Sequence, residues 1–127
     1  MSIIYFHSNI NKTASRLLKV IKTAAPKERI ELYQSIEELS KRLRQPSIKN
    51  NDIAILILSI NEIHYICSIK YLSNNIRIIL ILSDSAVETI AAACRLHPRY
   101  TGYMDSNFKD ISMVLKKMIN KKDKGQA

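Results

Sequence analysis

The chain has 127 residues, the length of about one domain, and a formal net charge of +9. Its apolar share of 46% is ordinary for a folded protein and excludes intrinsic disorder except at the ends. Its longest apolar runs fall far short of the ~20 residues of a membrane-spanning helix, and no basic leader precedes the first of them. We therefore expect one cytoplasmic domain over residues 1–120 and a polar tail over residues 121–127.

The first half of the sequence alternates between strand and helix patterns. Residues 2–7 predict a strand, and the helix after it has an apolar stripe from Ala14 to Ala25 and ends at Pro26. Residues 29–33 alternate polar and apolar, which is typical of a half-exposed strand near a sheet edge. A second helix follows from Ser35 and is expected to bury Ile36, Leu39 and Leu43.

The second half continues the alternation. Residues 53–58 (Ile-Ala-Ile-Leu-Ile-Leu) form a short apolar run that fits a strand buried on both faces, and Asn61 is expected to cap the next helix. Residues 76–82 predict a fourth strand, and residues 99–104 a fifth before a last helix with a stripe from Phe108 to Ile119. Asp84 or Ser85 is expected to cap the fourth helix, which should bury Val87, Ile90, Ala91 and Cys94.

Five strand–helix units with short connections predict an α/β fold. Short crossovers between buried strands require a parallel sheet with helices on both faces. The two cysteines, Cys67 and Cys94, each lie in a helical pattern and have no cysteine or histidine at metal-ligand spacing. We expect both to be reduced thiols, with no disulfide and no metal site.

Three segments carry a resemblance to a known family. They are residues 52–58 (Asp-Ile-Ala-Ile-Leu-Ile-Leu), 82–84 (Leu-Ser-Asp) and 102–106 (Gly-Tyr-Met-Asp-Ser). Together they resemble the third-, fourth- and fifth-strand segments of the receiver domain of bacterial response regulators. The resemblance covers essentially the whole chain, and it implies a flavodoxin-like (CheY-like) sheet with the strand order 2-1-3-4-5.

The same resemblance implies that the chemistry of the family is lost. Receivers use a third-strand aspartate as phosphoryl acceptor, two acids for Mg²⁺, a hydroxyl and a lysine. At the matching positions stand His7, Ser8, Ile57, Ser83 and Ser106. Only Ser83 keeps the family's residue type, Ile57 has no atom that could take a phosphoryl group, and a histidine–serine pair is a poor Mg²⁺ site. We expect a pseudo-receiver that accepts no phosphate, needs no cofactor or metal, and is not an enzyme.

Several rim residues leave alternatives open. His7 could act with a serine as base and nucleophile, or could fill the space of the lost metal site. Tyr103 matches the aromatic that switches rotamer in receivers, or is a partly exposed strand residue. Asp84 and Asp105 are expected near the same rim as a helix cap and a loop acid.

Two of the predicted helices carry rows of basic residues. Lys12, Arg16 and Lys19 recur at helical spacing with Lys22 beside them, and the last helix carries Lys109, Lys116, Lys117 and Lys121. In the 2-1-3-4-5 order these two helices cover the same face of the sheet, so their cations could form one positive band or two ordinary solvated faces. The interleaved aromatic residues that bind single-stranded nucleic acid by stacking are missing from these helices.

Three functions remain as alternatives. The first is a signalling module of a two-component system that works by protein–protein interaction through its fourth helix, fifth strand and fifth helix, as a dimer or an adaptor. Such a module could be the N-terminal part of a transcriptional regulator. The second is a basic module that binds nucleic acid or an acidic protein. The third is a small enzyme using His7, Ser8 or Ser83, which no converging set of acid, base and oxyanion donors supports.

Overall fold

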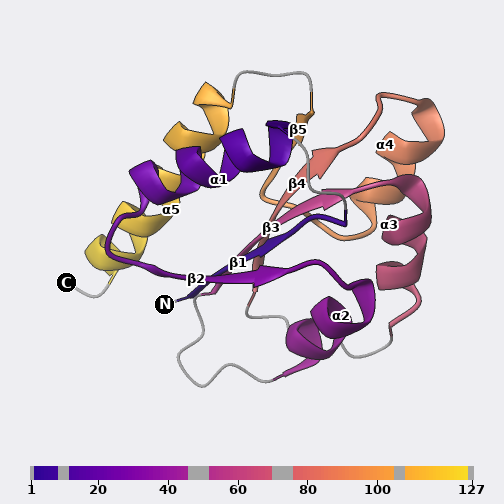
Figure 1. Cartoon of the computed structure of the whole chain (residues 1–127), viewed down its shortest axis with the longest axis horizontal. Helices are drawn as coiled ribbons and strands as arrows, with labels where there is room; N and C mark the ends of the chain where they lie inside the picture. The colour runs from indigo at the N-terminus through magenta and orange to yellow at the C-terminus, as the bar shows by residue number, and fades with distance from the viewer. Residues whose placement is uncertain (1, 9–11, 46–51, 70–75, 105–107, 126–127) are drawn as a thin grey trace.

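The computed structural model of the protein describes residues 2–8, 12–45, 52–69, 76–104 and 108–125, except for the side chains of residues 121–125. Strands and helices alternate over these residues (Figure 1). The strands are β1 (Ser2–Phe6), β2 (Arg29–Tyr33), β3 (Ile53–Leu58), β4 (Arg77–Leu82) and β5 (Tyr100–Tyr103). The helices are α1 (Lys12–Ala24), α2 (Ile36–Arg44), α3 (Ile60–Cys67), α4 (Val87–Cys94) and α5 (Lys109–Gly125).

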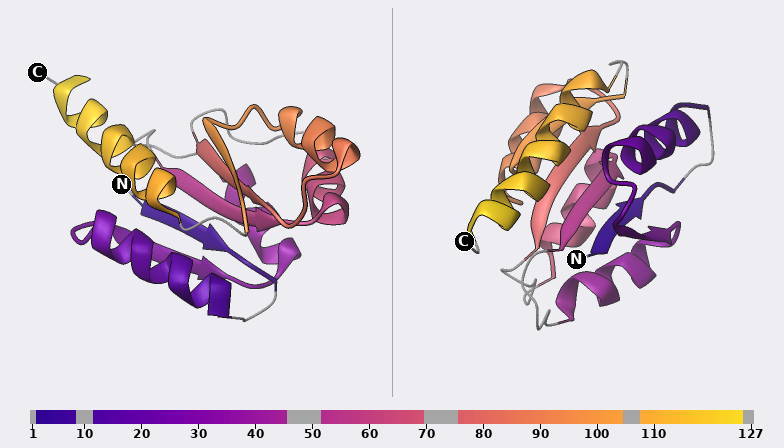
Figure 2. Two further views of the ribbon diagram at one scale, coloured as in Figure 1. Left: turned by 90° about the horizontal axis from the view of Figure 1, so that it is seen from above. Right: turned by 90° about the vertical axis from the view of Figure 1, so that its left-hand side faces the viewer.

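The five strands form one parallel sheet in the order β2-β1-β3-β4-β5, which confirms the predicted fold class. Helices α1 and α5 cover one face of this sheet, and α2, α3 and α4 cover the other (Figure 2). Each crossover reverses the chain direction, so the carboxyl ends of all five strands meet at one edge. This edge is where a site is expected in such a fold.

Strand β3 lies at the centre of the sheet and is buried along its whole length. Its alternate side chains pack on opposite faces, Ile55 and Ile57 with α1 and α5, and Leu56 and Leu58 with the other three helices. The prediction of a strand buried on both faces is therefore confirmed. Neither face of this strand offers a place for a polar side chain.

An ion-pair network joins α2 to the sheet. The Arg42 guanidinium lies 2.9 Å (Nε–Oε1) from Glu31 on β2 and 2.9 Å (Nη2–Oδ2) from Asp52, just before β3. Asp52 also accepts a hydrogen bond from the backbone N–H of Ser2 at 3.0 Å, and Glu31 accepts one from the Tyr33 hydroxyl at 2.8 Å. The consecutive elements β2, α2 and β3, and the start of β1, are thereby held together.

The predicted inward face of the fourth helix is wrong. Its buried side chains are Thr89, Ala92 and Ala93, whereas Val87 is 79% exposed and Ile90 is 37% exposed. Ala91 and Cys94 are exposed as well. The sheet side of α4 is made of small residues and one threonine, so a helix of bulkier residues on this side would lie farther from the sheet. The bulkier stripe therefore faces solvent.

Two predicted helix caps are also wrong. Helix α3 begins earlier than predicted, at Ile60, so Asn61 lies inside the helix. Its N-cap is Ser59, whose side chain forms a reciprocal capping box with that of Glu62. The N-cap of α4 is Ala86, not Asp84 or Ser85, and Asp84 instead accepts a hydrogen bond from the Ala86 N–H at 2.9 Å.

Helix α5 continues to Gly125 and so enters the segment predicted as a polar tail. The boundary between domain and tail at residue 120 stays a prediction. Within the described part of the chain, every helix is too short or too polar to span a membrane.

Candidate functional site

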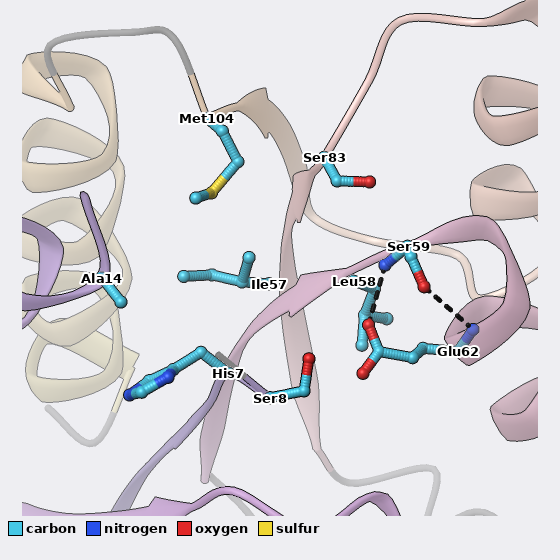
Figure 3. Close-up of a pocket in the computed structure, with 9 residues that line it drawn as sticks. All are labelled: His7, Ser8, Ala14, Ile57, Leu58, Ser59, Glu62, Ser83 and Met104. Carbon is cyan, nitrogen blue, oxygen red and sulfur yellow. Dashed lines mark hydrogen bonds between the residues drawn. The ribbon is translucent and has the colours of Figure 1, made fainter. Parts of the chain in front are cut away.

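A pocket of ≈ 370 Å³ lies at the carboxyl edge of the sheet, above the ends of β1, β3 and β4. Figure 3 shows the side chains around it. Four of the residues predicted from the receiver resemblance line this pocket, namely His7, Ser8, Ile57 and Ser83. The fifth, Ser106, lies outside the described residues. The fold thus brings together the positions that the sequence pattern assigned to one site.

Backbone hydrogen bonds fix the rim of the pocket. The N–H groups of His7, Ser83 and Met104 donate to the carbonyl groups of Tyr33, Leu58 and Leu82, each at 3.2 Å. The parallel ladders therefore continue one residue beyond the strands. This continuation places the first residue after β1, β4 and β5 at a defined point of the rim, so the position of Ser83 is determined by the sheet.

Ile57 forms part of the pocket floor. It is 8% exposed, pairs in register with Ile81 on β4, and packs with the core residues beneath α1 and α5. In Figure 3 its side chain lies between Ala14 of α1 and Met104, which follows β5. An apolar floor of this kind offers no nucleophile and no metal ligand at the end of the central strand.

Ser59 and Glu62 also line the pocket, and neither was predicted as a site residue. Ser59 accepts a hydrogen bond from the Glu62 N–H at 3.4 Å, and the Glu62 carboxylate accepts one from the Ser59 N–H at 2.9 Å (Figure 3). A serine followed three residues later by a glutamate is the sequence signature of a capping box. The sequence contains this signal, whereas the prediction ends the strand at Leu58 and places the helix cap at Asn61.

His7 stands above a buried tyrosine. The rings of His7 and Tyr5 are 5.4 Å apart and tilted by 51°. The Tyr5 hydroxyl donates a hydrogen bond of 2.7 Å to the carbonyl group of Ala14 and thereby ties β1 to α1. Burial raises the pKa of Tyr5 well above its usual value, so this hydroxyl stays a neutral donor.

The arrangement of strands and helices matches that of known structures. The chain has the CheY-like fold. A protein described as a pilus assembly protein (CpaE) from Burkholderia thailandensis superposes with a TM-score of 0.69 at 16% identity, over 94% of this chain and 98% of that one. A CheY-like response regulator from Mesorhizobium loti superposes with a TM-score of 0.57 at 11% identity, over 91% of this chain and 97% of that one. No protein-family model and no curated protein sequence matches the chain.

Receivers bind Mg²⁺ at this edge of the fold, but the described residues here do not fit that ion. Mg²⁺ requires oxygen ligands, mainly carboxylates, in octahedral geometry. The carboxylate of Glu62 is held by the N-terminus of α3. The carboxylate of Asp84 is exposed, and hydrogen bonds from Thr89 and from the Ala86 N–H keep its pKa below the usual value. Asp105 lies outside the described residues.

The remaining predicted residues lie away from the pocket floor. Tyr103 on β5 is half-buried and packs against the core cluster on the α2, α3 and α4 side of the sheet. Most of the predicted basic residues lie on α1 and α5 with exposed side chains, namely Lys12, Arg16, Lys19, Lys22, Lys109, Lys116 and Lys117. Lys121 lies in α5, but its side chain is outside the described ones.

Proposed function

We propose that this receiver-like chain is an interaction module that pairs with a second copy of itself through α4, accepts no phosphoryl group by the receiver mechanism, and catalyses no reaction. The observation that carries the proposal is the apolar stripe on α4, where Val87 is 79% and Ile90 37% exposed. Exposed large apolar side chains that lie together on one helix are a mark of an interaction site. Receivers as a family also use this helix for contacts.

The charges beside the stripe support a second copy as the partner. Glu88 and Arg95 are exposed near opposite ends of α4, and both line a groove between α3 and α4 together with Ala91. If two α4 helices cross antiparallel near Ala91, the Glu88 of each copy meets the Arg95 of the other. Such a self-complementary patch is what a two-fold symmetric dimer requires. The small side chain of Ala91 lets the two helices approach closely.

Replacing Val87 with glutamate should abolish this pairing. Burial of a carboxylate in an apolar interface is costly, so we expect the dimer dissociation constant to rise at least tenfold. A glutamate at the first position of a helix is favourable for folding, so the monomer should remain intact. Sedimentation velocity over a range of concentrations measures the change. Leu32→Glu is the matched control, because Leu32 is 58% exposed on the edge strand β2, far from α4.

A charge exchange tests the symmetry of the pair. Glu88→Arg and Arg95→Glu should each weaken the dimer by placing like charges together, and the double variant should restore it. A wild-type protein that stays monomeric at high concentration, or a double variant no better than the single ones, would contradict the proposal.

The absence of phosphoryl transfer is supported by Ile57 at the end of β3 and by the lack of a fitting Mg²⁺ ligand set among the described residues. Incubation with acetyl phosphate and Mg²⁺ should leave the intact mass of the protein unchanged, while a receiver with its acceptor aspartate gains a phosphoryl group under the same conditions. A phosphoryl group that appears on this chain would contradict this part of the proposal. The dimer through α4 is tested separately, by sedimentation velocity.

A further inference from the structure

The groove between α1 and α5 lies on the sheet face opposite α4. It has a volume of ≈ 280 Å³, and its walls include Arg16, Lys19 and Thr23 from α1 and Ser112 from α5. Val20 and Phe108 complete its lining. Figure 2 shows the two helices side by side over the same face of the sheet. Both helices run opposite to the strands and are therefore roughly parallel to each other.

Cations continue along both walls of this groove. Lys12 lies one turn before Arg16 on α1, and Lys109 and Lys116 lie three residues before and four residues after Ser112 on α5. Residues three or four apart share one face of a helix, so these lysines extend the rows that border the groove. The α1 row from Lys12 to Thr23 covers about 16 Å at ~1.5 Å per residue. Five cations and two hydroxyl groups thus border one linear depression.

Acidic side chains are almost missing from these two helices. Residues 12–24 contain no aspartate or glutamate, and α5 contains Asp110 and, near its carboxyl end, Asp123, whose side chain is outside the described ones. The Asp110 carboxylate accepts a 3.4 Å hydrogen bond from Tyr100 on β5. Asp110 is one residue from Lys109 and two from Ser112, so it lies off the row that faces the groove. Among the described side chains of α1 and α5, no carboxylate therefore lies on the rows that face the groove and balances their positive potential.

We propose that this groove binds the sugar–phosphate backbone of a nucleic acid duplex without regard to sequence. Arginine, lysine, serine and threonine side chains are the usual contacts to phosphate oxygens. An acidic protein is less well matched, because protein interfaces depend on buried apolar and aromatic anchors. The aromatic residue here, Phe108, is only 1% exposed and is covered by the Arg16 guanidinium, 5.1 Å from the ring centroid. For the same reason bases cannot stack on it, which favours duplex over single strand.

Phosphate contacts have a salt dependence that can be measured. With five cations at the groove, log Kd should change with log salt with a slope of about 4.5, since each phosphate contact contributes about 0.9. The affinity for short duplexes of random sequence, DNA and RNA in separate arms, should fall about 500-fold between ~50 and ~200 mM salt. Fluorescence anisotropy of labelled duplexes gives both values.

Two variants with the same net charge separate the groove from the overall charge of the protein. Lys19→Gln/Lys116→Gln should reduce the slope by about two and weaken binding at least tenfold at ~50 mM salt. Lys41→Gln/Arg44→Gln removes two exposed charges from α2, on the other face of the sheet, and should change neither value by much. Both variants should keep the circular dichroism spectrum of the wild type.

The proposal is overturned if the duplexes do not bind at ~50 mM salt, if both variants lose affinity equally, or if the slope stays unchanged in the groove variant. It is also overturned if polyglutamate competes as strongly as the duplex at equal charge, because the partner would then be an acidic protein. Val87→Glu should bind the duplexes with unchanged slope, so this test does not depend on the α4 dimer.

Discussion

Arg42→Ala should lower the free energy of unfolding by about 3 kcal/mol, at the lower end of the range for removing one partner of a buried ion pair. The side chains of Arg42, Glu31 and Asp52 are 15%, 18% and 11% exposed. In the variant the two carboxylates lose their guanidinium partner, and water can solvate them only in part. The variant also loses the link from α2 to β2 and to the start of β3. Urea denaturation at pH 7, followed by circular dichroism, measures the difference.

A neighbouring arginine supplies the control. Arg44 lies on the same helix but is exposed, and exposed ion pairs contribute no more than about 1 kcal/mol. Arg44→Ala should therefore change the free energy of unfolding by less than about 0.5 kcal/mol. Equal losses in the two variants would mean that helix propensity or net charge, and not the network, determines the stability.

The same network predicts how stability depends on pH. The hydrogen bond from Arg42 lowers the pKa of Glu31 below its usual 4.5. Burial works to raise the pKa of Asp52, but the hydrogen bonds from Ser2 and Arg42 outweigh it and lower the pKa below 3.8. A lowered pKa in the folded state contributes stability above the unfolded value, and this contribution is lost as pH falls through the folded value. Wild type should lose stability as the pH falls below ~4.5, and Arg42→Ala should lose clearly less. Parallel pH curves would contradict this account.

The sheet could be predicted from the sequence because burial determines it. Strand β3 has apolar side chains on both faces, and β2 alternates, so their predicted bounds of 53–58 and 29–33 agree with the structure. Because the connections between the strands and helices are short, the sheet was expected to be parallel. The order of the strands came from the receiver resemblance, and with it the four residues that meet at the pocket. The hydrophobic pattern was therefore enough to predict the parallel sheet, whereas the strand order and the pocket residues required the resemblance to receivers.

The orientation of α4 could not be predicted from the same pattern. Its sequence, Val-Glu-Thr-Ile-Ala-Ala-Ala-Cys, has apolar residues on nearly every side. The rule that the bulkiest stripe faces the core selected Val87 and Ile90, but the sheet side of the helix holds Thr89, Ala92 and Ala93. Hydrophobic periodicity cannot separate a core face from an interface when both are apolar. The error itself marks the surface on which the proposed dimer depends.

The ion-pair network was missed for a different reason. Glu31, Arg42 and Asp52 belong to three elements, and their contact follows from the way α2 packs beside β2 and β1. Nothing in the local sequence distinguishes Arg42 from Lys41 or Arg44 beside it. Long-range polar contacts of this kind require the packing geometry, whereas the capping box at Ser59 could have been found from spacing alone.

Ile57→Asp should be the most destabilising single change at the pocket, by about 4 kcal/mol at pH 7. The substitution removes apolar volume from the core beneath α1 and α5 and leaves a charge at a position that is 8% exposed. Burial raises the pKa of an aspartate in such a place, so part of the stability relative to wild type should return as the pH is lowered towards ~5 and the carboxyl group takes up a proton.

Ile57→Asn is the matched control for the charge. Asparagine has the shape of aspartate but does not titrate, so its loss relative to wild type should not change over the same pH range. If both variants respond to pH alike, the charge is not the cause.

Acetyl phosphate and Mg²⁺ then test the chemistry of the pocket. We expect no phosphoryl group on the Ile57→Asp variant, because His7 and Ser8 at the rim cannot supply the carboxylate ligands that Mg²⁺ requires. A phosphoryl group on this variant would show that the side chain at the end of β3 is the one barrier to the reaction, and that the rest of the pocket still supports it.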